Sequence, residues 1–528
     1  MTGIFPPLRP FGRAHLLAPT GSEAAILDRL AIQDGGVPQS VLMENAGRGS
    51  AEVLDRLFPR GRVVGIVGSG NNGGDALVLL RTLSAWGRDV QAVLVGDRAE
   101  GGSLLHGWSF PVMRDHELDE EGWTTLLSSA GVIVDGILGT GARGAPRARQ
   151  ADAIVRVNGA ERPVLSIDVP SGTCADTGAV PGVAVSADVT IAFGAPKLGT
   201  LMHPARARAG RLVVLEIGFP PWDAVAQDAI SGVVLTPAWA YENAPLRAAD
   251  THKNRVGRVL VVAGRKGMAG AAVLAVRGAL SAGAGSLRVC SFEENREVLQ
   301  AAVPEAIFVD AGDTDAIKEA LKAVDSVVMG PGLGTDAAAR AVVQCVVSGP
   351  PVALVVDADA LNLAAIGVFD LAAVAAARSV LATPHVGEMA RLTDLAQEVI
   401  MADRLAALRH ATDRFGHAVL LKGAPSLVSG PGHRVMVDTQ GISDLAAAGM
   451  GDALAGVCGT FLAQGLPATT AGGLGLFVLG RAARIAGRGV SLTPSDVIRW
   501  LPDALNERGS GITDLQLPGI MFDADPAI

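Results

Sequence analysis

Polar side chains that could do chemistry follow several short apolar runs in the first half of the 528-residue chain. The motif "GSGNNGGD" begins at Gly68, "DGILGTGARG" begins at Asp135, and "IDVPSGTCADTG" begins at Ile167. In open α/β sheets, ligands bind beyond the carboxyl ends of the strands. Asp168, next to a Pro-Ser-Gly turn, is the best placed of these residues to act as a general acid or base. The spacing therefore predicts one site at one edge of a sheet.

The same motifs offer groups for anions and for cations. Glycine-rich turns such as 139–144 expose backbone N–H groups to phosphate oxygens, and Arg143 adds a guanidinium. Asn72, Asp135 and Ser171 supply only oxygen ligands, which suits a hard cation better than zinc. The alternative for a strand-terminal aspartate is a helix cap.

Three glycines of the first motif, Gly68, Gly70 and Gly73, also fit the G-x-G-x-x-G pattern of dinucleotide-binding turns. Asp97 follows the next apolar run, as in that fingerprint. A hydride-transferring dehydrogenase is therefore one possible interpretation, although only the glycines support it.

The second half carries motifs that suit phosphoryl transfer. The motif "AAAGMGDALAGV" places Gly449, Gly451 and Asp452 at an expected helix start, where backbone N–H groups stabilise a transferring phosphoryl group. Asp452 could take a hydroxyl proton there, and Lys422 in "LLKGAPSLV" could grip a nucleotide. The alternatives are a tightly packed helix start for "GMGD" and a simple helix cap for His385.

These residues need strands and helices to position them, and the patterns predict two α/β domains. Continuous apolar runs alternate with Ala/Leu-rich segments, which is typical of parallel strands covered on both faces. In the first half the expected strands are 62–67, 90–95, 132–135, 164–168, 189–193 and 212–217. The Pro-edged stretch 220–245 predicts a domain boundary. We expect domains at 14–222 and 246–508, a linker at 223–245 and a loose tail at 509–528.

Composition excludes several classes of function. Aromatic residues make up 4% of the chain and the formal net charge is −9, so a nucleic-acid partner is not expected. The four cysteines are far apart, which suits a reducing compartment. No apolar stretch is long enough to predict a membrane span, and the Pro-rich N-terminus does not resemble a signal peptide. The sequence predicts a cytoplasmic protein.

The motifs of the first half, together with "LDRLAIQDGGVPQSVLMENAG", resemble the NAD(P)H-hydrate epimerase domain over residues 26–219. The resemblance implies a Rossmann-like three-layer α/β/α fold, Asp168 as proton carrier, and a potassium ion held by Asn72, Asp135 and Ser171. The resemblance implies one group of substrate contacts in a loop at 71–75 and another at 139–145. The implied contacts are Asn71, Asn72, Gly73, Gly74, Asp75, Gly139, Thr140, Gly141, Ala142, Arg143, Gly144, Ala145 and Asp168. Thr173 and Cys174 replace the usual Leu-Asp pair of the family, a departure that removes none of these contacts.

The second half resembles the ADP-dependent NAD(P)H-hydrate dehydratase family, with a ribokinase-like fold, over residues 252–501. The motifs that carry this resemblance include "GPGLG", "DADALN", "TPHVGEMARL" and "KGAPSLV". It implies substrate contacts at Ala271, Gly332, His385 and Asp452, and nucleotide contacts at Lys422, Gly423, Ala424, Pro425, Ser426, Gly449 and Gly451. Magnesium is expected on the phosphates. The family's usual Asn-Pro is missing from "GISDLA" (441–446), and Asp444 is expected to weaken nucleotide affinity.

Together the two resemblances imply a repair enzyme for hydrated NADH and NADPH. The first domain would interconvert the R and S hydrates, and the second would dehydrate the S form while ADP is converted to AMP and phosphate. The expected partners are small molecules (NADHX, NADPHX and ADP), and a homo-oligomer is expected. Two alternatives stay open: a hydroxymethylpyrimidine-type kinase fused to an accessory domain, and a non-catalytic scaffold role for the first domain.

Overall fold

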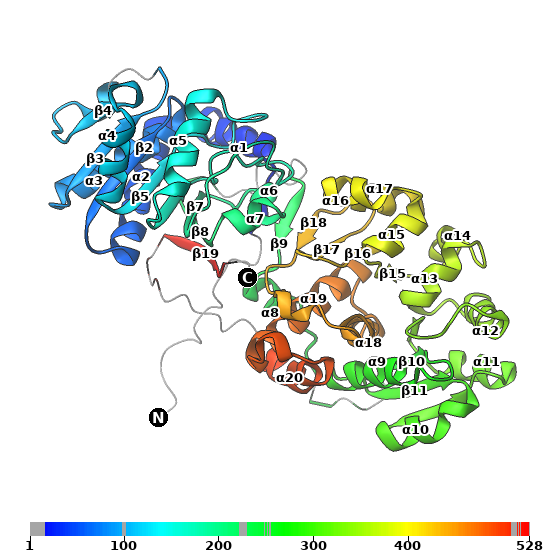
Figure 1. The fold of residues 1–528 in the computed structure, drawn as a ribbon. Helices are drawn as coiled ribbons and strands as arrows, with labels where there is room; N and C mark the ends of the chain where they lie inside the picture. Colours follow the sequence, from blue (N-terminus) through cyan, green and yellow to red (C-terminus); the bar gives the residue numbers. More distant parts are fainter. Residues whose placement is uncertain are drawn as a thin grey trace, which may run out of the picture. The chain divides into compact units, whose positions relative to one another are not determined.

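The computed structural model consists of two compact α/β units (Figure 1). It describes residues 16–97, 102–220, 230–247, 249–250, 252, 255–507, 515, 517 and 519–526. Unit 1 comprises Met1–Val234 and Gly511–Ile528, and unit 2 comprises Leu235–Ser510. Each unit has its own sheet and its own core.

The sheet of unit 1 has parallel strands except at one edge. Its strand order is β19-β8-β7-β6-β5-β2-β3-β4, and only β19 runs antiparallel. The strands are β2 (Arg62–Val67), β3 (Val90–Leu94), β4 (Val112–Arg114), β5 (Ala130–Gly136), β6 (Val164–Ile167), β7 (Val189–Phe193), β8 (Arg211–Leu215) and β19 (Ile520–Ala524). Strands β1 (Leu17–Ala18) and β9 (Gly232–Val234) also pair, in the antiparallel direction.

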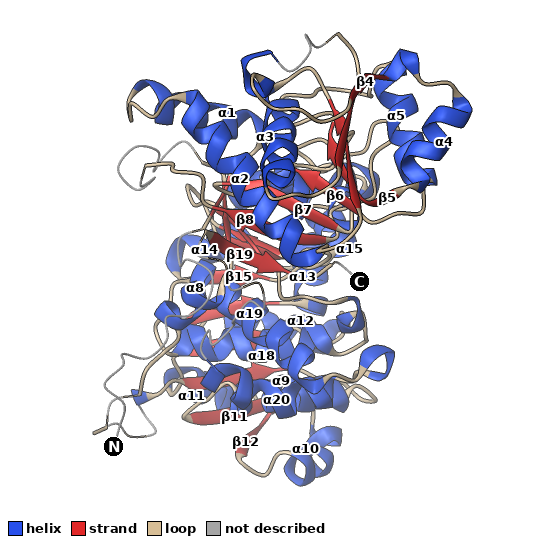
Figure 2. Cartoon of the chain, turned by 90° about the vertical axis from the view of Figure 1, so that its left-hand side faces the viewer, coloured by secondary structure: helices blue, strands red, loops and turns tan. Residues whose placement is uncertain are grey.

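Helices cover both faces of this sheet (Figure 2). Alternate residues of β2 point to opposite faces: Val63 packs with α2 and α3, whereas Val64 packs with α4 and α5. Parallel strands buried on both faces need apolar residues at nearly every position. The helices of unit 1 are α1 (Gly21–Gln33), α2 (Gln39–Leu57), α3 (Asn71–Ala85), α4 (Glu120–Ser128), α5 (Ala148–Gly159), α6 (Leu198–Leu201) and α7 (Ala205–Arg208).

The sheet of unit 2 has a parallel centre and an antiparallel hairpin at one end. The strand order is β18-β17-β16-β15-β14-β13-β10-β11-β12, in which β17 and β18 run antiparallel to their neighbours. The strands are β10 (Arg258–Val262), β11 (Ser286–Ser291), β12 (Ala306–Asp310), β13 (Ser326–Met329), β14 (Ala353–Val356), β15 (Val380–Ala382), β16 (Ala418–Leu421), β17 (Leu427–Ser429) and β18 (Val435–Val437).

Two apolar clusters cover the two faces of this sheet. Helices α9, α18, α19 and α20 pack on one face, and α11, α12 and α13 pack on the other. The helices of unit 2 are α8 (Pro237–Asn243), α9 (Ala269–Ser281), α10 (Arg296–Ala302), α11 (Thr314–Lys322), α12 (Ala337–Val347), α13 (Ala358–Ala365), α14 (Leu371–Ala377), α15 (Val386–Thr393), α16 (Gln397–Ala402), α17 (Arg404–Phe415), α18 (Met450–Ala463), α19 (Ala468–Ala486) and α20 (Pro494–Glu507). The predicted class, two α/β domains with parallel sheets, is confirmed.

The prediction of a loose C-terminal tail is wrong for part of the segment. Residues 520–524 form β19, which pairs antiparallel with β8, and Phe522 is buried. Arg211 donates two hydrogen bonds to the Asp523 carboxylate, at 2.8 and 2.5 Å. Residues 509–514, 516, 518, 527 and 528 of the predicted tail lie outside the described residues. The prediction rested on the Gly and Pro content of the whole segment, which gave no indication of the five-residue strand within it.

The predicted linker, 223–245, contains ordered elements in its second half. Strand β9 and helix α8 both lie there, while residues 223–229 are outside the described residues. Thr236 caps α8 by accepting a hydrogen bond from the Trp239 N–H at 3.1 Å, and Trp239 is buried.

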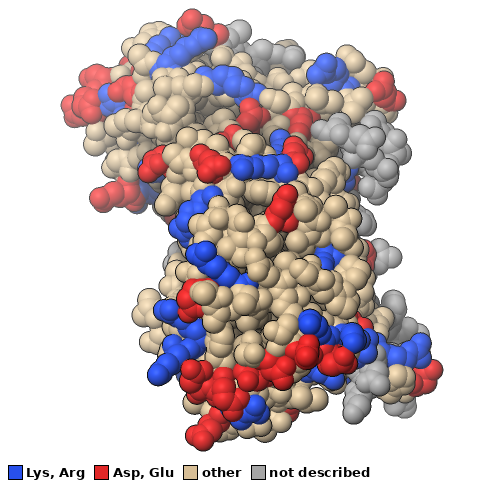
Figure 3. Space-filling model, turned by 90° about the vertical axis from the view of Figure 1, so that its right-hand side faces the viewer, with Lys and Arg blue, Asp and Glu red and all other residues tan. Residues whose placement is uncertain are grey.

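Positively and negatively charged side chains are interspersed on the face drawn in Figure 3, where Lys and Arg atoms lie among Asp and Glu atoms. Among the described helices, none is both long enough and apolar enough to span a membrane.

Candidate active sites

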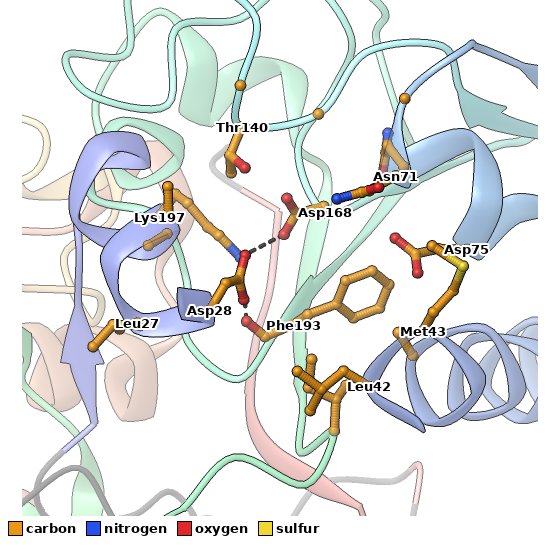
Figure 4. Close-up of a pocket in the computed structure, with 18 of the residues that line it drawn as sticks. Leu27, Asp28, Leu42, Met43, Asn71, Asp75, Thr140, Asp168, Phe193 and Lys197 are labelled. Carbon is orange, nitrogen blue, oxygen red and sulfur yellow. Dashed lines mark hydrogen bonds and ion pairs between the residues drawn. The ribbon is translucent and has the colours of Figure 1, made fainter. Parts of the chain in front are cut away.

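Unit 1 contains a cavity of about 690 Å³ at the carboxyl ends of its central strands. Its wall includes Asp168, which follows β6, Lys197, which follows β7, and Asn71 at the start of α3. Apolar side chains of α1 and α2, such as Leu27 and Leu42, form another part of the wall (Figure 4). This is the edge at which the sequence motifs were predicted to gather.

A buried ion pair between Lys197 and Asp168 lies in this cavity (Figure 4). The Lys197 ammonium donates to the Asp168 carboxylate and to the Phe193 carbonyl, the latter at 3.2 Å. Asp168 has a φ of +67°, a left-handed conformation that non-glycine residues rarely adopt. Such strain is typical of functional positions, because the surrounding structure must enforce it.

A second carboxyl group, Asp28 of α1, faces the same ammonium group (Figure 4). Desolvation by the surrounding protein raises the pKa of Asp28, although part of its side chain stays exposed. The Lys197 charge acts in the opposite direction, and the Asp168 charge raises this pKa further. The cavity thus holds one ammonium between two carboxyl groups.

The segment 71–75 is helical, which corrects its interpretation as a loop. Gly70 is the N-cap of α3, so Asn71 to Asp75 form the first turn and a half of the helix. Asn71, Asn72 and Asp75 line the cavity, whereas Gly73 and Gly74 are buried in the helix and are absent from its wall. Gly68 packs against the Ile137 backbone so closely that any side chain would overlap it.

The glycine-rich segment after β5 contributes only its first half to the cavity. Gly139, Thr140, Gly141 and Ala142 line it, and Gly144 and Ala145 do not. The neighbouring Arg143 also lies outside the wall and forms an ion pair with Asp176 at 3.4 Å.

The three residues predicted to hold a potassium ion are linked by hydrogen bonds, and of the three only Asn72 lines the cavity. The Asp135 carboxylate is fully buried and accepts hydrogen bonds from the Ser171 hydroxyl at 2.5 Å and the Ser171 N–H at 2.9 Å. Burial raises the pKa of Asp135, and the Ser171 hydrogen bonds oppose this rise. Asn72 and Ser171 both contact the Leu138 carbonyl, at 2.9 and 3.2 Å. The Asn72 Oδ1 atom is buried without a hydrogen-bond partner.

In unit 2, Asp452 lies in the first turn of α18, which begins at Met450. The N-cap is Gly449, whose φ of +89° favours glycine. Burial raises the pKa of Asp452 to about 7, and the nearby Asp357 charge adds to this effect while Lys422 opposes it. A carboxyl group with this pKa can exchange a proton near neutral pH.

Lys422 connects the motifs around Asp452. Its ammonium lies 2.7 Å from Asp357 Oδ1 and 3.8 Å from Glu388 Oε2. Burial alone would lower the pKa of Lys422, but these two carboxylates raise it. The Thr383 hydroxyl also donates to Asp357, at 2.8 Å. Four separate motifs thus meet at one charge cluster.

The other predicted substrate residues of unit 2, Ala271, Gly332 and His385, lie at the same edge of the sheet. His385 caps α15, since its Nδ1 accepts a hydrogen bond from the Gly387 N–H at 3.0 Å. Gly332 has a φ of +56°, and an added Cβ would lie 2.9 Å from the Ala271 Cβ. The Gly334 N–H donates to Asp359 at 2.7 Å.

The predicted nucleotide loop, 422–426, connects β16 to β17. The Ser426 hydroxyl accepts a hydrogen bond from the Gly423 N–H at 3.2 Å and donates one to the Gly423 carbonyl at 3.0 Å. An added Cβ at Gly451 would lie 3.3 Å from the Lys422 ammonium, so this end of the loop reaches the start of α18. Ala424 and Pro425 are joined by a cis peptide bond, and Asp444 lies in a short 3₁₀ turn, Ser443–Leu445.

Comparisons with known proteins match both halves of the chain. Residues 259–502 match the family model described as NAD(P)H-hydrate dehydratase, and residues 39–199 match the YjeF-related protein N-terminus. The bifunctional NAD(P)H-hydrate repair enzyme of Moorella thermoacetica is 34% identical over 96% of this chain and 99% of that protein. The chain belongs to this family. The relative from Escherichia coli is 32% identical, with 84% of each chain covered.

Among solved structures, a ribokinase-like superfamily protein of Enterococcus faecalis is 24% identical to the chain. The match covers 53% of this chain and 98% of that chain, with a TM-score of 0.48.

Sequence reasoning did not single out four charged residues that belong to these clusters. Lys197 stands in "FGAPKLG", which begins at the last residue of the expected strand 189–193, so its position was a usable signal. Asp28 lies inside a helix, and its partners are distant in sequence. Asp357 and Glu388 lie within quoted motifs, but only the structure brings them to Lys422.

Proposed function

We propose that each unit of this chain carries one of two consecutive repair activities. Unit 1 interconverts the R and S hydrates of NADH and NADPH. Unit 2 removes water from the S hydrate while ADP is converted to AMP and phosphate. The proposal rests on one observation about this member of the family. In each unit, carboxylate side chains gather at the edge of the sheet where the parallel strands end.

The cavity of unit 1 suits inversion at a carbon that carries a hydroxyl group. In the hydrates, C6 of the nicotinamide ring bears the hydroxyl and must become planar before its configuration can invert. The hydroxyl proton passes to Asp168, the proposed carrier, while the C6–N1 bond breaks with its electron pair going to N1, which leaves a planar carbonyl carbon at C6. N1 then re-forms the bond on the opposite face of C6, and the proton returns to the oxygen. Lys197 holds the Asp168 carboxylate in place, and Asp28 offers a second protonatable group beside it. Asn71, Asp75 and the turn 139–142 provide polar groups for the rest of the dinucleotide.

Asn72, Asp135 and Ser171 are the proposed potassium ligands. All three present oxygen atoms, and the buried Asn72 Oδ1 has no hydrogen-bond partner. An orphaned buried amide oxygen, a buried carboxylate and a hydroxyl together suit a hard cation. Because Asn72 and Ser171 contact the Leu138 backbone, the ion would fix the turn that follows β5.

Unit 2 suits activation of the same hydroxyl as a leaving group. Asp452 takes the proton from the C6 hydroxyl, and the oxygen attacks the terminal phosphoryl group of ADP as the bond to AMP breaks. Phosphate then leaves C6 with the bonding electrons, a proton leaves C5, and the double bond of the dihydronicotinamide is restored. The N–H groups at the start of α18 stabilise the charge on the phosphoryl group. Ala271, Gly332 and His385 are proposed to contact the substrate.

Magnesium would neutralise charge on the nucleotide phosphates in this step. Within the described part of the chain, no three His, Cys, Asp or Glu side chains form a group that could hold a metal ion. A magnesium ion here would be held mainly by phosphate and water oxygens. Lys422 and the loop 423–426 are proposed to bind the nucleotide, together with Gly449 and Gly451. A homo-oligomer and a cytoplasmic location complete the proposal.

A single assay tests both activities. The full chain is incubated with a mixture of R and S hydrates, with and without ADP, in potassium or in lithium buffer, and the two epimers are separated by chromatography. We expect ADP-dependent loss of both epimers in potassium, with release of AMP and phosphate. In lithium, loss of the S hydrate should continue while the R hydrate persists. A stable phosphorylated product would instead support the small-molecule kinase, and unchanged epimers would support a scaffold role for unit 1.

A further inference from the structure

Arg404 is a buried cation behind the predicted nucleotide loop. It is the first residue of α17, and only 9% of its surface is exposed. Arginine side chains are rarely buried to this extent unless they are paired.

The Arg404 guanidinium contacts the loop through backbone carbonyls. Its Nη2 donates to the carbonyl oxygens of Leu421, Lys422 and Pro425, at 3.4, 3.3 and 3.0 Å. Leu421 and Lys422 stand at the beginning of the segment 421–426, and Pro425 stands near its end. One planar group therefore ties together both sides of the turn.

Gly423 is required by this arrangement. Its φ is +150°, and an added side chain would overlap the Arg404 guanidinium. The guanidinium thus fills the space behind the loop, and the loop is shaped around it.

The charge of Arg404 has no carboxylate counterpart in the described part of the chain. No ion pair of Arg404 is found there, and its Nε is buried without a hydrogen-bond partner. Burial lowers the pKa of Arg404 to about 10, so the group stays charged at pH 7. A buried charge without a partner is costly, and a nearby anion would offset that cost.

We propose that Arg404 is a positioning residue of the nucleotide site, which shapes the loop 422–426 and supplies a positive charge that favours binding of the ADP phosphates. This inference rests on the proposed function of unit 2. Asp452 and Lys422 act at the reacting end of the nucleotide, whereas Arg404 lies behind the loop and contacts no reacting atom. Its loss should therefore weaken nucleotide binding more than it slows the chemical step.

Arg378 offers a matched control. Its guanidinium likewise donates to three carbonyls, those of Val346, Val347 and Gly349, at 3.5, 2.8 and 3.3 Å. Its Nε is also buried without a partner. However, Arg378 precedes β15, at the opposite end of the strand from the proposed site. The two arginines share their mode of contact and differ in location.

The test compares Arg404→Gln, Arg404→Lys and Arg378→Gln in the full chain, with the S hydrate as substrate. We expect Arg404→Gln to raise KM for ADP at least tenfold, with kcat changed less than threefold and epimerisation unchanged. Arg404→Lys keeps the positive charge but lacks the planar guanidinium. Its KM for ADP should therefore lie between those of the wild type and Arg404→Gln. The rise in Tm that ADP causes should shrink in Arg404→Gln and persist in Arg378→Gln.

Equal KM values for ADP in Arg404→Gln and Arg378→Gln would overturn the inference. So would a loss of kcat with an unchanged KM, because that result would place Arg404 in the chemical step. If Arg404→Gln does not fold, the comparison of Arg404→Lys with Arg378→Gln provides the same test, since lysine keeps the charge but cannot reach all three carbonyls as the guanidinium does. A wild-type chain that does not use ADP would refute the proposed function itself, before any variant is measured.

Discussion

At the scale of single residues, Asp168 shows how backbone and side chain combine at a site. Its left-handed conformation directs the carboxylate toward Lys197, at the carboxyl end of β6. Asparagine tolerates this conformation better than most residues, so Asp168→Asn should keep the local backbone. We expect this variant to lose at least about 100-fold in epimerisation rate, because its amide cannot carry the proton.

The measurement for Asp168→Asn is the rate at which pure R hydrate converts to S hydrate. Dehydration of the S hydrate, measured by the return of reduced-nicotinamide absorbance, should be unchanged. Asp152→Asn is the matched control, since this side chain is 61% exposed in the same unit. Equal epimerisation rates in the two variants would remove Asp168 from the mechanism.

The pKa of about 7 for Asp452 predicts a pH dependence of the dehydration step. The proposed base works as the carboxylate, so kcat/KM should rise about tenfold from pH 6 to pH 8 as the group ionises. Asp452→Asn should be inactive across this range and should leave epimerisation intact.

The same pKa gives an independent stability test of Asp452. Because folding raises this pKa, ionisation costs stability, and that cost grows as the pH rises through 7. The Tm of Asp452→Asn relative to wild type should therefore increase between pH 6 and pH 8. A pH-independent difference in Tm would contradict the raised pKa.

The sequence could predict the residues at the ends of strands but not their partners across the fold. Asp168 and Asp452 were found because each stands at a recognisable strand end or helix start. Asp28 and Lys197 are 169 positions apart in the chain, and no local pattern joins them. No sequence pattern indicated Arg404 either, because its proposed role depends on the carbonyl groups that surround it in the fold.

At the scale of elements, buried strands were the most predictable feature. The runs 62–67 and 189–193 match β2 and β7 residue for residue, since a strand covered on both faces must be apolar throughout. The first turn of α3 was misread as a loop, because its sequence "NNGGD" has weak helix propensity. Gly70 as N-cap and burial of the helix against the sheet outweigh that propensity.

Strand β19 carries a prediction about the stability of unit 1. Phe522 is 2% exposed, so Phe522→Ala should lower the free energy of unfolding of unit 1 by about 3 kcal/mol. The midpoint of epimerase loss in urea should fall, whereas the midpoint of dehydratase loss should not. Val155→Ala is the control, because Val155 is 55% exposed in α5 of the same unit. A segment without a structural role would leave both midpoints unchanged.

At the scale of the whole molecule, the two sites lie in different compact units, each with a central parallel sheet and an apolar core of its own. The proposed catalytic residues of each site belong to one unit: Lys197 and Asp168 to unit 1, and Lys422 and Asp452 to unit 2. The S hydrate is both the product of the first site and the substrate of the second. The two activities should therefore be separable on different chains.

A mixing experiment tests this independence. Asp168→Asn alone, given an equal mixture of hydrates and excess ADP, should convert the S half rapidly and the R half only at the spontaneous rate. Asp452→Asn alone should convert neither hydrate to the reduced cofactor. Mixed together, the two variants should restore complete conversion, because S hydrate released by one chain diffuses to the other. If the mixture behaved like Asp168→Asn alone, the intermediate would have to pass between sites of one chain, and the units could not act independently.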